Sequence, residues 1–136
     1  MKVKQFIPDD QYLDNLVSGL KNQYINLDLT DIVNIKKCKE VLVYEATKDE
    51  NFDGDSDQFV ETFFAEVRGL QQDKGADHVV MCIAYDASDP ISLESMSHIN
   101  DFCELFDEDT EVRWGMSQNE GGVPMRIVVA IGRLPQ

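Results

Sequence analysis

Residues 78–85, HVVMCIAY, are nearly all apolar and are the strongest indication of the architecture in the sequence. The run is too short to be stable as a free helix. An apolar run of this length predicts a central strand that other elements cover on both faces or nearly so. The elements predicted on either side of this strand define the rest of the fold.

Amphipathic helices are predicted before and after the central strand. Apolar residues recur at helical spacing over residues 9–22, 57–72 and 92–106, which gives each segment one apolar face. Lys74 and Gly75 are expected to close the second of these helices, as a cation and a left-handed cap.

Three further strands complete the pattern. Residues 40–46 are β-branched and aromatic, and residues 110–118 alternate apolar and polar side chains. After the turn-like run 119–122 comes another strand, 125–134, so the last two strands are expected to form a hairpin. We predict a single α+β domain over residues 1–136, a two-layer sandwich in which amphipathic helices pack on a four-stranded mixed sheet.

The composition excludes several classes of function. The chain has 136 residues and a formal net charge of −14, and no basic face is visible, so neither nucleic acid nor direct membrane contact is expected. The first residues have no apolar core of a secretory signal, and no apolar run approaches the length of a membrane-spanning helix. Cys38, Cys82 and Cys103 are far apart and odd in number, which indicates reduced thiols and a cytoplasmic location.

Residues 49–61, DENFDGDSDQFVE, resemble a calcium-binding loop over their first nine positions. The candidate ligands are Asp49, Asn51, Asp53 and Asp57. The position that should hold a bidentate Glu is Val60, so an acidic turn that caps the following helix is the better interpretation. No other metal site, nucleotide-binding loop or activated nucleophile is indicated, and no cofactor is expected.

Residues 24–31, YINLDLTD, place Asn26, Asp28 and Asp31 together after the first helix. As structure, Asp28 or Thr30 would cap a short helix that runs to about Lys37. As chemistry, the two carboxylates could orient a water or bind a cation. Composition alone favours the cap.

Several segments together resemble the C-terminal domain of the bacterial tubulin FtsZ. INLDLTDI resembles the N-x-D-x-x-D synergy loop of that family, and GADHVVMCI resembles its Gly-Ala-led strand. The helix 92–106 and the stretch TEVRWGMSQNEGGVPMRIVVAIG resemble its closing helix and strand pair. The resemblance covers about residues 9–132 in the same order and implies a tubulin/FtsZ C-terminal fold, with 9–23 as a remnant of the central helix.

The resemblance also implies a role for the loop 24–31. Asp28 and Asp31 would reach the nucleotide of the next subunit and help to activate water against its γ-phosphate, and Asn26 would support the loop. The chain lacks the family's Gly-rich G-G-G-T-G-T-G loop, so GTP would have to be bound by a partner chain. It also lacks the disordered tail, and it is either a separately encoded domain or a fragment of a longer one.

The leading hypothesis is a non-enzymatic interaction domain of the cell-division cytoskeleton. Its partner would be a second copy of itself or an FtsZ-like GTPase subunit, and it could modulate FtsZ-type filaments. The alternative is a homo-oligomeric enzyme on a related α+β sandwich that binds a small molecule or cation. In a third interpretation the fold has lost any link to division and the N-x-D-x-x-D pattern is only a cap.

Overall fold

The computed structural model describes residues 2–23, 27, 29–71, 75–122 and 124–134. Five strands form one mixed sheet in the order β1-β2-β5-β3-β4. β3 and β4 are parallel, and every other neighbouring pair is antiparallel. The strands are β1 (Lys4–Phe6), β2 (Glu40–Thr47), β3 (His78–Asp86), β4 (Glu111–Asn119) and β5 (Arg126–Arg133).

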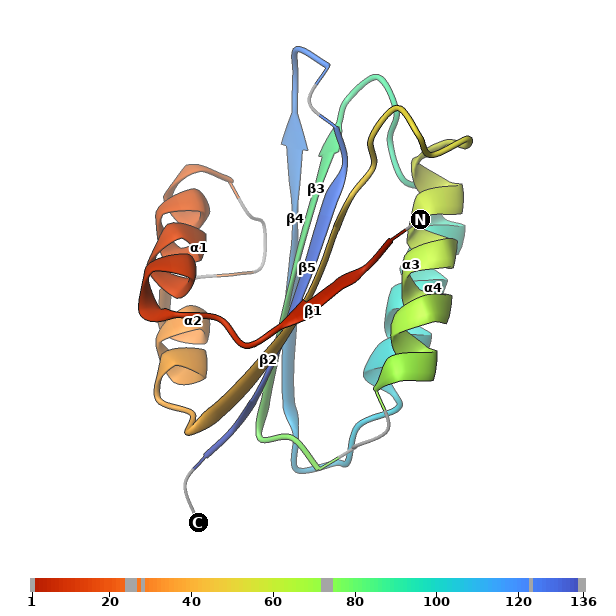
Figure 1. Cartoon of the computed structure of the whole chain (residues 1–136). Helices are drawn as coiled ribbons and strands as arrows, with labels where there is room; N and C mark the ends of the chain where they lie inside the picture. The colour runs from red at the N-terminus through yellow and green to blue at the C-terminus, as the bar shows by residue number, and fades with distance from the viewer. Residues whose placement is uncertain (1, 24–26, 28, 72–74, 123, 135–136) are drawn as a thin grey trace.

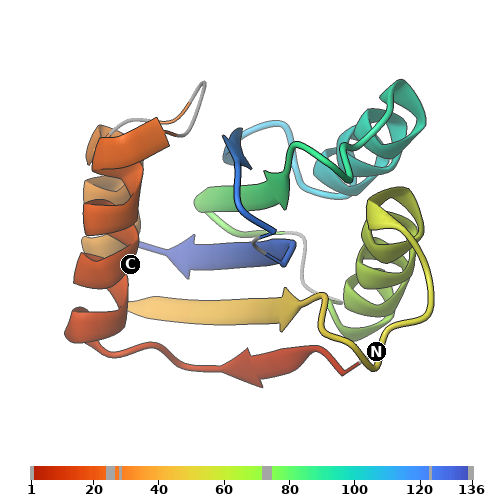
Figure 2. The same cartoon turned by 90° about the horizontal axis from the view of Figure 1, so that it is seen from above.

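Helices cover both faces of the sheet (Figures 1 and 2). One face carries α1 (Asp10–Gln23) and α2 (Leu29–Lys36), and the other carries α3 (Ser56–Leu70) and α4 (Leu93–Cys103). The α+β class and the mixed sheet are confirmed. The expected two layers are in fact three, since α1 and α2 lie across the sheet from the other pair.

The sheet has one strand more than predicted. β1 has only three residues, KQF, and two of its side chains are exposed. Three residues are too few to show a periodicity in the sequence. The position of β1 depends instead on its pairing with Val43–Glu45 of β2. Phe6 secures it, with its ring 5.0 Å from that of Tyr12 in α1.

The expected hairpin between the last two strands is wrong. β3 lies between β4 and β5, parallel to β4 and antiparallel to β5. The turn itself is tight, with Gly121 and Gly122 at φ +91° and +77°. A glycine turn fixes the local reversal but not which strands pair, and the apolar β3 takes the position with a neighbour on each side.

Alternate residues of the central strand enter two separate cores. Val79, Met81 and Ile83 of β3 face α3 and α4, whereas Val80 and Cys82 face α1 and α2. All five are at most 3% exposed. This explains the almost continuous apolar run in the sequence, because a strand covered on both faces shows no polar alternation.

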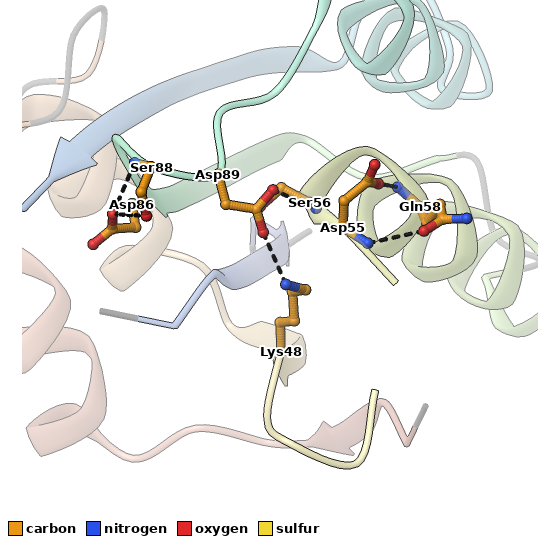
Figure 3. Close-up of polar contacts among 7 residues, drawn as sticks. All are labelled: Lys48, Asp55, Ser56, Gln58, Asp86, Ser88 and Asp89. Atoms are coloured by element: carbon orange, nitrogen blue, oxygen red, sulfur yellow. Dashed lines mark hydrogen bonds and ion pairs between the residues drawn. The ribbon is translucent and has the colours of Figure 1, made fainter. Parts of the chain in front are cut away.

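The acidic loop before α3 does cap that helix. The Asp55 side chain accepts a hydrogen bond from the backbone N–H of Gln58, whose side chain accepts one from the Asp55 backbone (Figure 3). At the other end α3 stops at Leu70, where Gln71 turns to an extended conformation. The prediction that Lys74 and Gly75 end this helix is therefore wrong, because the helix already ends at Leu70.

Candidate functional site

The predicted synergy-like loop, 24–31, leads into the first turn of α2. Asn26 and Asp28 lie outside the residues that the structure describes. Leu27 between them is only 8% exposed and packs into the core beneath α1 and α2. Leu27 itself therefore has a structural role as a core residue.

Asp31 lies in the first turn of α2. Ile32 and Ile35, one position and one turn further on, are fully buried against the sheet and fix the rotation of the helix. This orientation turns Asp31 towards the edge strand β4, and its side chain is 12% exposed.

A row of charged and polar side chains runs from Asp31 along the sheet. Its carboxylate Oδ1 lies 4.0 Å from Nε of Arg113 on β4. The Arg113 guanidinium also lies 3.2 Å from Glu111, and Glu111 lies 3.4 Å from Nδ1 of His78 on β3. The crevice that these residues line has no room for a water molecule. This part of the surface can present charge to another molecule, but it does not enclose a ligand.

The sequence predicted Asp31 but not Arg113. The two residues are far apart in sequence and meet only because α2 packs beside the parallel pair β3 and β4. One signal was available: the alternation over 110–118 places Arg113 on the face opposite Trp114. Assigning that face to α2 requires the strand order, which the sequence does not show.

The four calcium candidates are distributed over a loop and a helix. Asp49 Oδ1 accepts a hydrogen bond from the backbone N–H of Asn51, an ordinary turn contact. Asp57 Oδ1 accepts hydrogen bonds from the Ser92 backbone and the Ser95 hydroxyl at 2.7 and 2.5 Å.

These hydrogen bonds join Asp57 to the start of α4 rather than to the loop. That from Ser95 above all lowers the pKa of Asp57. Across the described residues, no three His, Cys, Asp or Glu side chains group in a way that could hold a metal ion. The arrangement serves to join the two helices.

A second polar cluster fastens the loops at the ends of β2 and β3 (Figure 3). Lys48 forms a 2.8 Å ion pair with Asp89, which also accepts a hydrogen bond from the backbone of Ser56. Asp86 accepts hydrogen bonds from the backbone and hydroxyl of Ser88. Because the acceptor atoms are already engaged by the protein itself, we assign the cluster a structural role.

The three cysteines are free thiols, of which Cys82 is buried in the core beneath α1 and α2 and Cys103 packs against the core beneath α3 and α4. Burial raises the pKa of Cys82 to about 12 and that of Cys103 to about 11. Burial also raises the pKa of Cys38. The thiols are thus protonated at neutral pH, which disfavours nucleophilic chemistry at these positions.

No protein-family model and no curated protein matches the sequence. Among solved structures, an empty FtsZ dimer from M. jannaschii is similar, with 17% sequence identity and a TM-score of 0.58 over 90% of this chain and 37% of that one. A point mutant of FtsZ from M. jannaschii gives 17% identity and a TM-score of 0.61, over 92% and 39%.

These similarities show a shared fold, in agreement with the resemblance seen in the sequence. The chain spans less than two fifths of the length of the FtsZ chains that it matches. Within the described part of the chain, no helix is long and apolar enough to cross a membrane.

Proposed function

We propose that this chain is an interaction domain of the FtsZ C-terminal type, which docks the loop 24–31 and the start of α2 onto a partner subunit. The observation that carries the proposal is the placement of Asp31 within an FtsZ-like fold. Asp31 is the last residue of the predicted loop and lies in the first turn of a helix that Ile32 and Ile35 fix against the sheet. The partner would be a second copy or an FtsZ-like GTPase subunit.

Docking would bring the carboxylates of Asp28 and Asp31 beside a nucleotide held by the partner, with Asn26 supporting the loop. A preorganised charge placed there can orient an attacking water and stabilise charge that develops in the transition state. The chain would contribute to hydrolysis only in trans, with GTP bound by the other subunit and no cofactor of its own. Such a domain would alter the turnover or the ends of filaments.

The test mixes the protein with an FtsZ and measures the GTP hydrolysis rate and polymer length. We expect the wild-type chain to change both, and Asp31→Asn to lose most of the effect on hydrolysis, on the order of tenfold or more. Asp101→Asn, an exposed acid on α4 with the same loss of charge, is the matched control and should behave as wild type. An unchanged rate and polymer length with the wild-type chain, or equal effects of the two variants, would contradict the proposal.

A further inference from the structure

The two edges of the sheet differ in how well they are protected from pairing with another chain. β1, at one edge, has three residues, begins with Lys4 and is soon followed by Pro8. β4, at the other edge, pairs with β3 over nine consecutive residues without a bulge and contains neither lysine nor proline. Short length, lysine and proline are common means of protecting an edge strand. The β4 edge lacks all three.

Hydrogen bonds at the two ends of β4 show which of its backbone groups face β3. The N–H of Glu111 donates a 2.9 Å hydrogen bond to the carbonyl of Asp77, and the carbonyl of Asn119 accepts one of 2.8 Å from the N–H of Ala87. Successive residues of a strand direct their N–H and C=O to opposite sides, so the odd-numbered residues from 111 to 119 bond to β3.

The even-numbered residues of β4 therefore direct their backbone groups away from the sheet. These residues are Val112, Trp114, Met116 and Gln118. In the described part of the chain their outward groups form a single hydrogen bond, in which the carbonyl of Val112 accepts from the Arg113 guanidinium at 3.3 Å. The edge thus offers a nearly complete ladder to a further strand.

Apolar side chains at this edge are only partly covered. Val112, Trp114 and Met116 pack against the core beneath α3 and α4, but all three are half-buried. A strand added beside β4 would cover them, and removal of apolar area from water would stabilise the pair.

The sequence of β4 is complementary to itself in an antiparallel pair centred on Gly115. This register overlaps all nine residues and brings the outward groups of both strands opposite each other. Trp114 lies opposite Met116 of the partner subunit, a favourable pairing of sulfur and aromatic ring. Arg113 lies opposite Ser117 of the partner subunit, so like charges do not face each other directly.

We infer that β4 pairs with β4 of a second copy of this chain, antiparallel about a two-fold axis at Gly115, so that the two sheets become one. The same surface of each copy then contributes equally, as in most symmetric dimers. Each chain carries a net charge of −14, so the copies repel each other and added salt favours the dimer. The inference rests on the β4 edge and does not depend on docking of the loop 24–31.

Analytical ultracentrifugation over a range of protein concentrations tests the dimer. We expect a reversible equilibrium between monomer and dimer, with a dissociation constant that falls at least about threefold between about 50 mM and about 500 mM NaCl. A chain that stays monomeric at about 1 mM, or a dimer that salt dissociates, would overturn the inference.

A matched pair of proline variants locates the interface. Gln118→Pro removes one outward N–H but none that bonds to β3, and it should weaken dimerisation at least about tenfold. Gln5→Pro introduces proline into the opposite edge strand, β1, and should dimerise as wild type. Both glutamines are exposed, and circular dichroism should show that both variants remain folded. Equal dissociation constants for the two folded variants would show that β4 is not the interface.

Gln5 is a suitable control because its N–H also points outwards. The hydrogen bond from Lys48 to Met125 places the even-numbered residues of β2, including Tyr44, among those that bond to β5. Gln5 lies opposite Tyr44 and so directs its own backbone groups away from the sheet.

Amide hydrogen exchange of the wild-type chain tests the register without any substitution. The amides of Trp114, Met116 and Gln118 should become more protected as protein concentration rises, whereas the amide of Gln5 should not change. Unchanged exchange at all three would overturn the inference. Protection that stops before Gln118 would contradict a pair centred on Gly115.

Discussion

Glu45 joins α1 to the sheet through polar contacts. It accepts a 2.5 Å hydrogen bond from the Tyr12 hydroxyl and lies 3.2 Å from the Arg126 guanidinium, so that three elements meet at one carboxylate. Burial raises its pKa, but the hydrogen bonds from Tyr12 and Arg126 and the charge of Arg126 outweigh it, and the pKa is lowered.

A lowered pKa in the folded state means that Glu45 stabilises the protein above its unfolded pKa of about 4.3. This contribution is lost as the pH falls through the lower folded pKa. Glu45→Gln should therefore reduce the free energy of unfolding by about 1–2 kcal/mol at pH 7, with a smaller difference at pH 3. Urea denaturation at both values measures it, with Glu108→Gln, an exposed acid, as the control. A difference from wild type that does not shrink at pH 3 would show that the charge of Glu45 is not responsible.

Gly132 on β5 lies so close to Cys38 that no side chain fits between them. A Cβ at this position would be 2.5 Å from the Cys38 sulfur and 3.0 Å from its Cβ. Gly132→Ala should lower the free energy of unfolding by about 1–3 kcal/mol. Gly69→Ala in α3, where a new Cβ meets nothing within 4 Å, should instead raise it by about 0.5–1 kcal/mol. Chemical denaturation of both variants checks the contrast, and equal effects would refute the close approach.

At the scale of elements, the capping box of α3 gives a direct prediction. Asp55→Ala removes the acceptor for the Gln58 N–H and should cost about 1 kcal/mol of stability. Asp53→Ala, an exposed acid in the same loop, should cost much less. The melting temperatures of the two variants measure the difference, and a larger loss for Asp53 would assign the loop a role other than capping.

The elements also show how far the sequence leads. The helices α1, α3 and α4 follow from an apolar period in the sequence, and β4 follows from its alternation. The strands β2 and β3 follow from their composition, and the short helix α2 follows only from its capping residues. β1 was missed because three residues carry no period. The prediction that β4 pairs with β5 was wrong, because turn residues determine only the local reversal of the chain, whereas strand order depends on burial across the whole sheet.

In the candidate site too, features that depend on a sequence pattern were predicted, and contacts that depend on packing were not. Asp31 was found because a spacing pattern is a property of the sequence. Arg113 was missed because its contact with Asp31 depends on the packing of α2 beside β4. The Tyr12, Glu45 and Arg126 contacts were missed for the same reason, since they join residues 33 and 114 positions apart.

At the scale of the whole molecule, the position of β5 has a consequence for the order of folding. β5 is the last of the described strands along the chain, yet it lies in the middle of the sheet, between β2 and β3. Without it, β1 with β2 and β3 with β4 are two ribbons that share no ladder. Residues 126–133 must therefore be present before either core can close, and we expect this domain to fold in one step once they have been synthesised rather than progressively.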